Sequence, residues 1–172
     1  SNEIDFDMAT FKYGNILKSQ HKGIEGLLGI YKSSRIRLNS TIDIGEVTFD
    51  SGDHKGNMLK NIPKITYTNR LFLKIGTLTN LVLTQKFFGK VYLDDANTVS
   101  LPSNTIVNCK LQFIINNLSI DFSLFNLADK QYHSSGYLLF DPMIQENVQF
   151  YFPAQRRYFH FNFNYKLSSL NK

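Results

Sequence analysis

The final strand-like stretch of the chain alternates between apolar and polar residues without a break. Residues 159–167 read FHFNFNYKL, with a ring or leucine at every odd position and histidine, asparagine or lysine at every even one. Successive side chains of a β-strand point to opposite faces. One face of this strand is therefore apolar and the other polar. The fold then depends on what covers the apolar face: a protein core, a ligand or lipid.

Other stretches of the chain show the same period of two, although Phe72 and Val82 break the pattern. Five are clear: 35–47, 64–74, 79–87, 106–115 and 118–126. A further stretch at 21–31 alternates more weakly. Together with 159–167 they predict seven strands, and residues 3–6 (EIDF) are consistent with the tail of an eighth.

The composition favours strands and excludes several other classes of protein. The chain has 15 Phe and 9 Tyr, with 42% hydrophobic and 19% charged residues, which is typical of a folded chain. The net charge of +5 is mild and the basic residues are scattered, whereas a nucleic-acid-binding domain usually gathers them into a patch. Cys109 is the single cysteine, so no internal disulfide forms. No run approaches the roughly 18 apolar residues of a membrane helix.

Short and long connections alternate along the predicted strands. In an up-and-down sheet every second link lies at the same end, so one end carries tight turns and the other extended loops. Outer-membrane barrels have this asymmetry. The short links are 32–34, 75–78 and 116–117, and the long, polar ones are 50–63, 89–105 and 127–155.

These patterns predict an all-β fold, an antiparallel up-and-down transmembrane β-barrel segment of about seven or eight strands. Strands that cross the membrane need about 9–11 residues, with apolar side chains outward and aromatic girdles near both ends. Phe87, Tyr92 and Tyr158 are suitably placed for the girdles. A soluble lipocalin-like β-barrel that binds an apolar ligand also alternates, with its apolar face inward. The strict alternation and the one-sided loops favour the membrane barrel. A small self-standing outer-membrane barrel is the third alternative.

The last third of the sequence resembles the C-terminal end of TonB-dependent outer-membrane receptors. In that family a strand ends in an Asn-Leu-Phe-Asp-Lys-x-Tyr phrase, and NLADKQY at 126–132 is similar to it. A Pro-x-x-Arg-x-Phe phrase leads into the last strand of the family, and PAQRRYF at 153–159 resembles it. Two shorter likenesses lie earlier in the chain. They comprise Asn15, Ser19, Gly23 and Glu25 before one strand, and Asn61, Pro63 and Lys64 before another.

The resemblance implies a transport barrel of 22 strands whose lumen is filled by a separate plug domain. Such receptors import scarce nutrients such as an iron-siderophore complex or cobalamin, with energy supplied through TonB. Residues 1–167 are then expected to be the C-terminal portion of the barrel and 168–172 a polar tail. Leu167 stands where the family usually has an aromatic residue. We expect a curved open sheet, because this segment is only about the final third of such a barrel and contains no plug.

Partners and orientation follow from the same resemblance. The implied partners are the chain's own plug domain and the rest of the barrel, TonB through the plug, outer-membrane lipid and a small-molecule chelate, with no nucleic acid. Family C-termini lie in the periplasm, so the long links are expected outside the cell. No nucleophile, acid–base pair, cofactor motif or metal-ligand spacing points to an enzyme.

Two sets of candidate site residues follow. The ligand-loop candidates are polar residues of the long links, although solvated loop residues are the simpler interpretation: Asp53, His54, Asp94, Asp95 and His133. The lipid-facing candidates are Leu118, Ile120, Phe122, Phe159, Phe161, Phe163 and Tyr165. On the opposite face, a charged lumen wall is expected from Arg35, Arg37, Asp43, Arg70, Lys110, Asp121 and Lys166.

Overall fold

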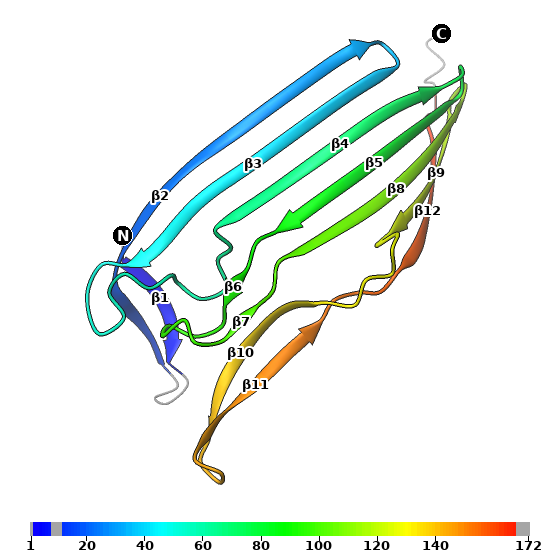
Figure 1. The fold of residues 1–172 in the computed structure, drawn as a ribbon. Helices are drawn as coiled ribbons and strands as arrows, with labels where there is room; N and C mark the ends of the chain where they lie inside the picture. Colours follow the sequence, from blue (N-terminus) through cyan, green and yellow to red (C-terminus); the bar gives the residue numbers. More distant parts are fainter. Residues whose placement is uncertain (1, 8–11, 168–172) are drawn as a thin grey trace.

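The computed structural model describes residues 2–7 and 12–167, and its regular elements are all strands (Figure 1). The long strands are β2 (Lys12–Ser33), β3 (Ile36–Phe49), β4 (Ile65–Ile75), β5 (Thr79–Phe88), β8 (Asn104–Ile115), β9 (Leu118–Phe125) and β12 (Tyr158–Tyr165). Shorter or detached strands are β1 (Asn2–Asp7), β6 (Val91–Tyr92), β7 (Ser100–Leu101), β10 (His133–Asp141) and β11 (Glu146–Pro153). The described residues form no helix long and apolar enough to span a membrane.

The long strands form one antiparallel sheet in the order β2-β3-β4-β5-β8-β9-β12, and β1 pairs with the first part of β2. Neighbours in the sheet follow one another along the chain, apart from the small hairpins inserted before β8 and β12. The seven predicted strands and the up-and-down fold class are confirmed. Residues 3–6 lie in β1. The predicted tail at 168–172 lies outside the described residues.

Tight turns lie at one end of the sheet and long links at the other (Figure 1). The tight turns occupy residues 34–35, 76–78 and 116–117, and the last two use a residue that tolerates a left-handed backbone. Gly76 has φ 72° and Asn116 has φ 54°. The long links occupy 50–64, 89–103 and 126–157. We call these two ends the short-turn end and the long-link end.

The expectation that residues 127–155 form a polar loop is wrong. They contain the β10–β11 hairpin, in which Tyr137 stands opposite Phe150 and the two rings stack 5.2 Å apart. The signal in the sequence is an apolar run, YLLF at 137–140, before an Asp-Pro pair, and a second strand-like stretch, NVQFYF at 147–152, after it. The link at 89–103 likewise contains the two-residue strands β6 and β7.

The register between strands separates polar from apolar side chains across the whole sheet. Residues that stand directly opposite one another share a face. Two successive rows of the apolar face are Ile36–Leu73–Leu81–Leu111–Phe122–Phe161 and Leu38–Leu71–Leu83–Cys109–Leu124–Phe159. The row between them lies on the polar face and contains Arg37, Phe72, Val82, Lys110, Ser123 and His160. Phe72 and Val82, which break the sequence pattern, are therefore one directly opposed apolar pair on the polar face.

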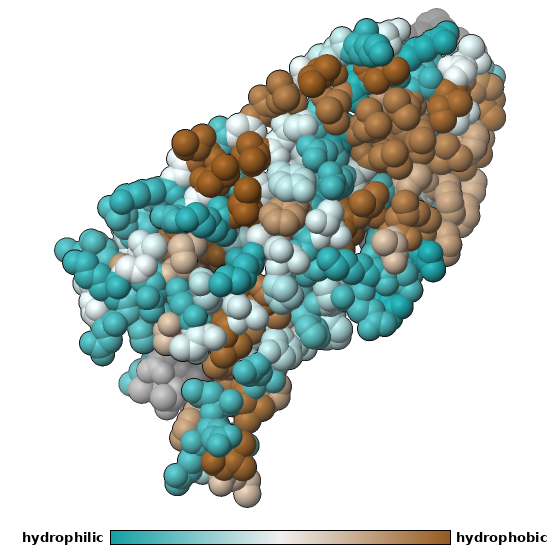
Figure 2. Space-filling model, viewed as in Figure 1, coloured by the Kyte–Doolittle hydropathy of each residue, from teal (hydrophilic) through white to brown (hydrophobic). Residues whose placement is uncertain are grey.

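The apolar face has one polar break of its own. Ser40, Asn69 and Gln85 occupy one row of it, and Asn69 Nδ2 donates to Gln85 Oε1 at 3.1 Å. Figure 2 shows hydrophobic side chains gathered over the upper parts of β4, β5 and β8 and over β2 and β3, with hydrophilic residues between the two groups. The mutual hydrogen bond lowers the cost of placing two amides among apolar side chains.

The apolar face is left uncovered. Phe161 is 60% exposed and Phe163 is 69% exposed. The buried hydrophobic residues of the described chain lie instead at or beyond the long-link end of the strands: Phe49, Leu59, Leu93, Leu101 and Ile106. A lipocalin-like barrel would bury the apolar face of its strands in its interior, so that alternative is not favoured.

The sheet is open, as expected. Within residues 2–7 and 12–167, β12 pairs with β9 alone, and no pairing joins β12 to β1 or β2. Both outer strands therefore keep a row of backbone N–H and C=O groups for which the described residues supply no partner. Such edges bind further strands readily, and hydrocarbon does not tolerate them unpaired.

A side-chain clamp joins two of the long links. The Asn97 amide donates to the Met58 carbonyl at 2.8 Å, and the Met58 N–H donates back to Asn97 Oδ1 at 2.8 Å. Asn97 itself has φ 59°, a left-handed conformation that asparagine adopts more readily than most residues. The clamp fixes the link before β4 against the link before β8.

We predict that Asn97→Ala loosens this clamp by roughly 1–3 kcal/mol, because the two hydrogen bonds to Met58 and a third to the Asp94 carbonyl are lost and alanine is strained at positive φ. Hydrogen exchange at the Met58 and Leu59 amides measures the loss. Asn97→Gly keeps the backbone conformation and loses only the side-chain bonds, so it should have the smaller effect. Unchanged exchange in both variants would show that the clamp does not hold these links together.

Candidate functional site

A hydrogen-bonded charged network lies on the polar face toward the short-turn end. Lys110 Nζ lies 2.6 Å from Asp121 Oδ2, and Asp121 is only 7% exposed. Gln112 Nε2 donates to Asp121 Oδ1 at 3.0 Å, and Asn80 Nδ2 donates to Gln112 Oε1 at 3.1 Å. Neighbouring strands are thus joined by side chains as well as by backbone. Lys110 and Asp121, both expected on the lumen wall, are brought together by this pairing.

A cavity of about 480 Å³ opens on the polar face toward the long-link end of this network. The guanidinium carbon of Arg37 lies 4.2 Å from the centre of the Phe72 ring. The lining thus combines cations with an apolar floor, and it includes Arg37, Arg70, Phe72, Val82, Lys86 and Phe125.

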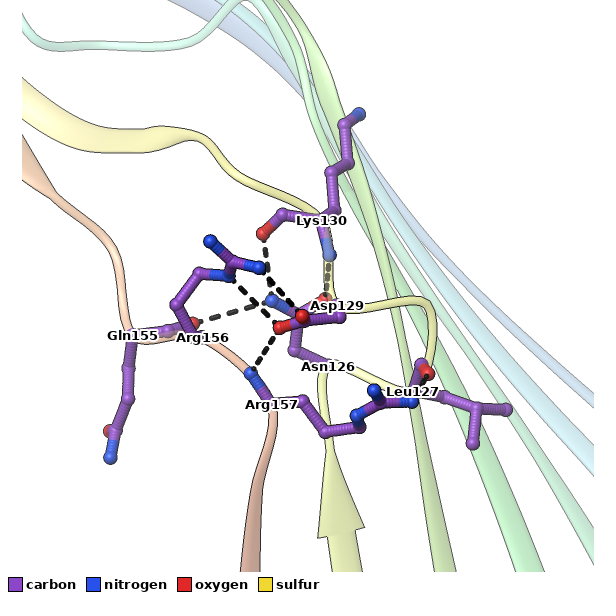
Figure 3. Close-up of polar contacts among 7 residues, drawn as sticks. All are labelled: Asn126, Leu127, Asp129, Lys130, Gln155, Arg156 and Arg157. Atoms are coloured by element: carbon purple, nitrogen blue, oxygen red, sulfur yellow. Dashed lines mark hydrogen bonds and ion pairs between the residues drawn. The ribbon is translucent and has the colours of Figure 1, made fainter.

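At the long-link end, a polar latch ties the segment after β9 to the segment before β12 (Figure 3). Arg156 forms a bidentate pair with Asp129, with Nε donating to Oδ1 at 2.9 Å and Nη2 to Oδ2 at 2.6 Å. The Arg157 N–H donates to the same Oδ1 at 2.9 Å. The β10–β11 hairpin lies between these two segments in the chain, so the latch closes its base.

Asn126 is the buried centre of the latch, with 4% of its surface exposed. Its Oδ1 accepts from the Lys130 N–H at 2.9 Å, and its Nδ2 donates to the Lys130 carbonyl at 2.9 Å and to the Gln155 carbonyl at 3.3 Å. Its own N–H donates to Asn108 Oδ1 on β8. Asn126 has φ 51° and Asp129 has φ 53°, so the loop needs residues that accept a left-handed backbone.

The latch holds Asp129 in its charged form. The Arg156 guanidinium, followed by the Arg157 N–H, lowers the pKa of Asp129 well below its usual range. Hydrogen bonds to the charged form and a nearby cation both favour ionisation. The same pair raises the pKa of Arg156.

Comparison with known proteins gives a consistent result for the fold. No family model and no curated protein matches the sequence. Among solved structures, the siderophore receptor PiuA of Acinetobacter baumannii superposes with a TM-score of 0.72 at 20% identity, over 90% of this chain and 23% of its own. The ferric yersiniabactin uptake receptor FyuA of Yersinia pestis has a TM-score of 0.76 at 16% identity, over 90% and 24%. The ferric-catecholate import receptor Fiu of E. coli K12, closed form, has a TM-score of 0.69 at 16% identity, over 95% and 23%.

This chain has the fold of a TonB-dependent receptor barrel wall. It spans about a quarter of the length of the receptors it resembles, which are 22-stranded barrels. Those receptors are transporters rather than enzymes.

The latch explains the phrases that resemble the receptor family. Asn126, Asp129 and Lys130 come from the first phrase and Arg156 from the second, and the structure brings them into one network. Tyr132 contributes through its backbone, because its carbonyl accepts from the Ala154 N–H at 2.9 Å. The sequence alone predicted no contact among these residues, and it suggested that Arg156 lies at the membrane interface or binds an anion. An Asn and an Asp in a short polar segment were nevertheless a signal for a left-handed turn.

The ligand-loop candidates do not form one cluster. Asp94 stabilises its own loop, accepting hydrogen bonds from the Thr98 N–H, the Thr98 hydroxyl and the Val99 N–H. Partial burial works against ionisation of Asp94, but these bonds together still lower its pKa. Asp95 lies 3.8 Å from Lys60. Among the residues described, no group of three or more His, Cys, Asp or Glu side chains could hold a metal ion.

The remaining loop candidates differ in their surroundings. Asp53 is exposed, and the His54 ring lies 6.1 Å from that of Phe49. His133 stacks on Tyr151 at 4.8 Å between ring centres. It also borders a cavity of about 550 Å³ together with Lys130, Tyr132 and Arg156. Of the five candidates, His133 is therefore the one with a cavity and an aromatic neighbour.

The lipid-facing candidates share the apolar face at the β9–β12 edge. Phe159 is 60% exposed and Tyr165 is 63% exposed, while Leu118, Ile120 and Phe122 are half-buried and stand opposite residues of β12 on the same face. Phe122 stacks on Phe159 with 5.6 Å between ring centres. Contact of this face with lipid stays a prediction.

We predict that Asp129→Asn opens the base of the β10–β11 hairpin, because the bidentate charge-assisted pair with Arg156 is lost. Limited proteolysis of the segment 127–132 measures the opening. Asp141→Asn is the matched control, since Asp141 lies at the far end of the same hairpin, where its carboxylate accepts from the Met143 N–H. Equal cleavage of the two variants and the unmodified protein would contradict the role of the latch.

The pH dependence of this cleavage follows from the lowered pKa of Asp129. A carboxylate with a depressed folded-state pKa stabilises the fold fully above its unfolded pKa of about 3.9 and loses that contribution as pH falls through the folded value. Protection should therefore persist down to about pH 4 and fail only below it. Pepsin, active in this range, provides the assay. Protection already lost at about pH 4.5, where pepsin still cleaves, would contradict the expectation.

Proposed function

We propose that this chain is a wall segment of an outer-membrane receptor that takes up a scarce nutrient, such as an iron-siderophore complex or cobalamin, by a TonB-dependent route. The observation that carries the proposal is the two-faced sheet, which exposes an apolar face and keeps a charged, hydrogen-bonded face opposite it. Hydrocarbon on one side and a polar lumen on the other are the surroundings that suit these two faces. The solved receptors with this fold are named for siderophore and ferric-chelate uptake, which supports the nutrient class.

The other parts of the molecule have roles consistent with this function. The open edges bind the remaining strands of the barrel, since unpaired backbone groups are not tolerated in lipid. The polar face contacts a plug domain, which connects the receptor to TonB. The long links lie outside the cell and contribute to capture of the chelate, with His133 and its cavity as the best-placed of the loop candidates. Asp53, His54, Asp94 and Asp95 remain candidates for weaker contacts.

The orientation of the two faces can be tested on neighbouring residues of β12. Phe161 lies on the apolar face and His160 on the polar one. Phe161→Arg should lower the stability of the membrane-inserted protein by about 2–4 kcal/mol, because a cation would face the middle of the bilayer. His160→Arg places the same side chain in the lumen and should change stability by less than about 0.5 kcal/mol. Heat-modifiable mobility of the folded protein from outer-membrane fractions gives the readout. Equal tolerance of arginine at both positions would reject the proposed lipid-facing side.

Transport is tested in cells that produce the protein as encoded and lack other iron receptors. Uptake of ⁵⁵Fe-labelled chelates should require the protein and should stop when TonB is deleted or the proton gradient is collapsed. Uptake that persists without TonB would indicate a passive pore. Absence of uptake for every ferric chelate and for labelled cobalamin, with the protein correctly inserted, would remove nutrient import as its function.

A further inference from the structure

Three cations on the polar face have no anionic partner in the described part of the chain. Arg37, Arg70 and Lys86 make no ion pair or side-chain hydrogen bond there, and all three are exposed. Lys110, the fourth cation that lines the same cavity, is neutralised by Asp121 at 2.6 Å. The surplus positive charge therefore belongs to three neighbouring strands, β3, β4 and β5.

The register places the three cations on a diagonal line. Arg37 stands opposite Phe72, and Arg70 is two residues from Phe72 on the same strand. Arg70 in turn stands opposite Thr84, and Lys86 is two residues from Thr84. Diagonal neighbours on one face of a sheet lie about 7–8 Å apart. Neighbouring cations on this line therefore repel one another, and an anion bound among them would attract all three.

The cavity beside these cations has the size and the lining of a ligand site. Its volume is about 480 Å³, within the range of roughly 300–1,000 Å³ typical of small-molecule sites. Phe72, Val82 and Phe125 are the apolar side chains of its lining, and the Arg37 guanidinium lies 4.2 Å from the Phe72 ring centre. The unpaired cations of this lining suit a negatively charged group better than a neutral one.

We propose that Arg37, Arg70 and Lys86 form an anion site on the lumen wall, which makes the receptor favour negatively charged chelates over neutral ones. This inference rests on the proposed function and adds that the imported chelate is negatively charged. Cobalamin, which has no comparable negative charge, is then the less suitable of the two nutrient classes. Rows of Lys and Arg side chains select anions in other membrane pores by the same electrostatics.

The test compares two ferric chelates that differ mainly in charge. Tris(catecholato)iron(III) carries three negative charges and is used at pH 9, where Lys and Arg remain cationic. Tris(acetohydroxamato)iron(III) is neutral and also surrounds the iron with six oxygens. Binding of each ⁵⁵Fe-labelled chelate is measured on outer-membrane vesicles that contain the protein as encoded. The test variant combines Arg37→Gln, Arg70→Gln and Lys86→Gln, and Lys74→Gln removes a cation from the same face of β4 that does not line the cavity.

We expect the triple variant to lose at least about tenfold in affinity for the anionic chelate, a change typical of losing charge-assisted hydrogen bonds. Its affinity for the neutral chelate should stay within about twofold, and Lys74→Gln should leave both unchanged. The charge-conserving combination Arg37→Lys with Arg70→Lys should retain the preference for the anion. Equal losses for both chelates, or no loss, would overturn the proposal.

A second measurement decides whether the anion at this site is the ferric chelate or a carboxylate of the plug domain. If carboxylates of the plug domain occupy the site, the triple variant lowers the Tm of the ligand-free protein and leaves the preference between chelates unchanged. That result overturns the proposal. If the unmodified, correctly inserted protein binds neither these chelates nor cobalamin, the proposed function itself fails. Binding of the chelates without a preference for the anion overturns this inference alone.

Discussion

The structure depends above all on strand register. Side chains alternate with a period of two, so a slip of one residue between any two strands would move every later apolar side chain to the polar face. The rows that begin at Ile36 and Leu38 run unbroken to β12, which shows that no such slip occurs over six strands. Because the sheet encloses no core, this segregation of faces takes the place of interior packing. A lipid environment also requires that backbone N–H and C=O groups be paired, and the hydrogen bonds between neighbouring strands pair them inside the sheet.

The long-link end is stabilised by different means. There Leu59, Leu93 and Leu101 are buried, and asparagine and aspartate side chains form polar clamps. Asn97 and Asn126 each combine a left-handed backbone with an amide that bonds backbone groups of other segments. One residue type thus both shapes a turn and holds it in place. Links of this length would otherwise have few contacts to restrain them.

The sequence predicted the sheet well and the loops poorly. Alternation is a local signal, so seven strands, their faces and the position of the tight turns could be read directly from it. The β10–β11 hairpin was missed because its aromatic residues lie in a stretch also rich in polar and turn-forming residues, which suggested a loop. The latch could not be predicted from physical patterns, since Asp129 and Arg156 are 27 residues apart and meet only after the hairpin between them has folded. Phe72 and Val82 each break the alternation of their own strand, and only the register shows that they stand opposite one another as a pair.

The strands shorten markedly across the sheet. β2 has 22 residues, β3 has 14, and β9 and β12 have 8 each. About 9–11 residues suffice for a strand to cross a bilayer, so at about 3.3 Å per residue β2 exceeds that length by tens of ångströms along its own axis. The long-link end of the sheet is consequently uneven. It extends far along β2 and ends early along β9 and β12, where the β10–β11 hairpin is attached. A molecule that approaches the long-link end would therefore meet the extended β2–β3 pair on one side and the latched β10–β11 hairpin on the other.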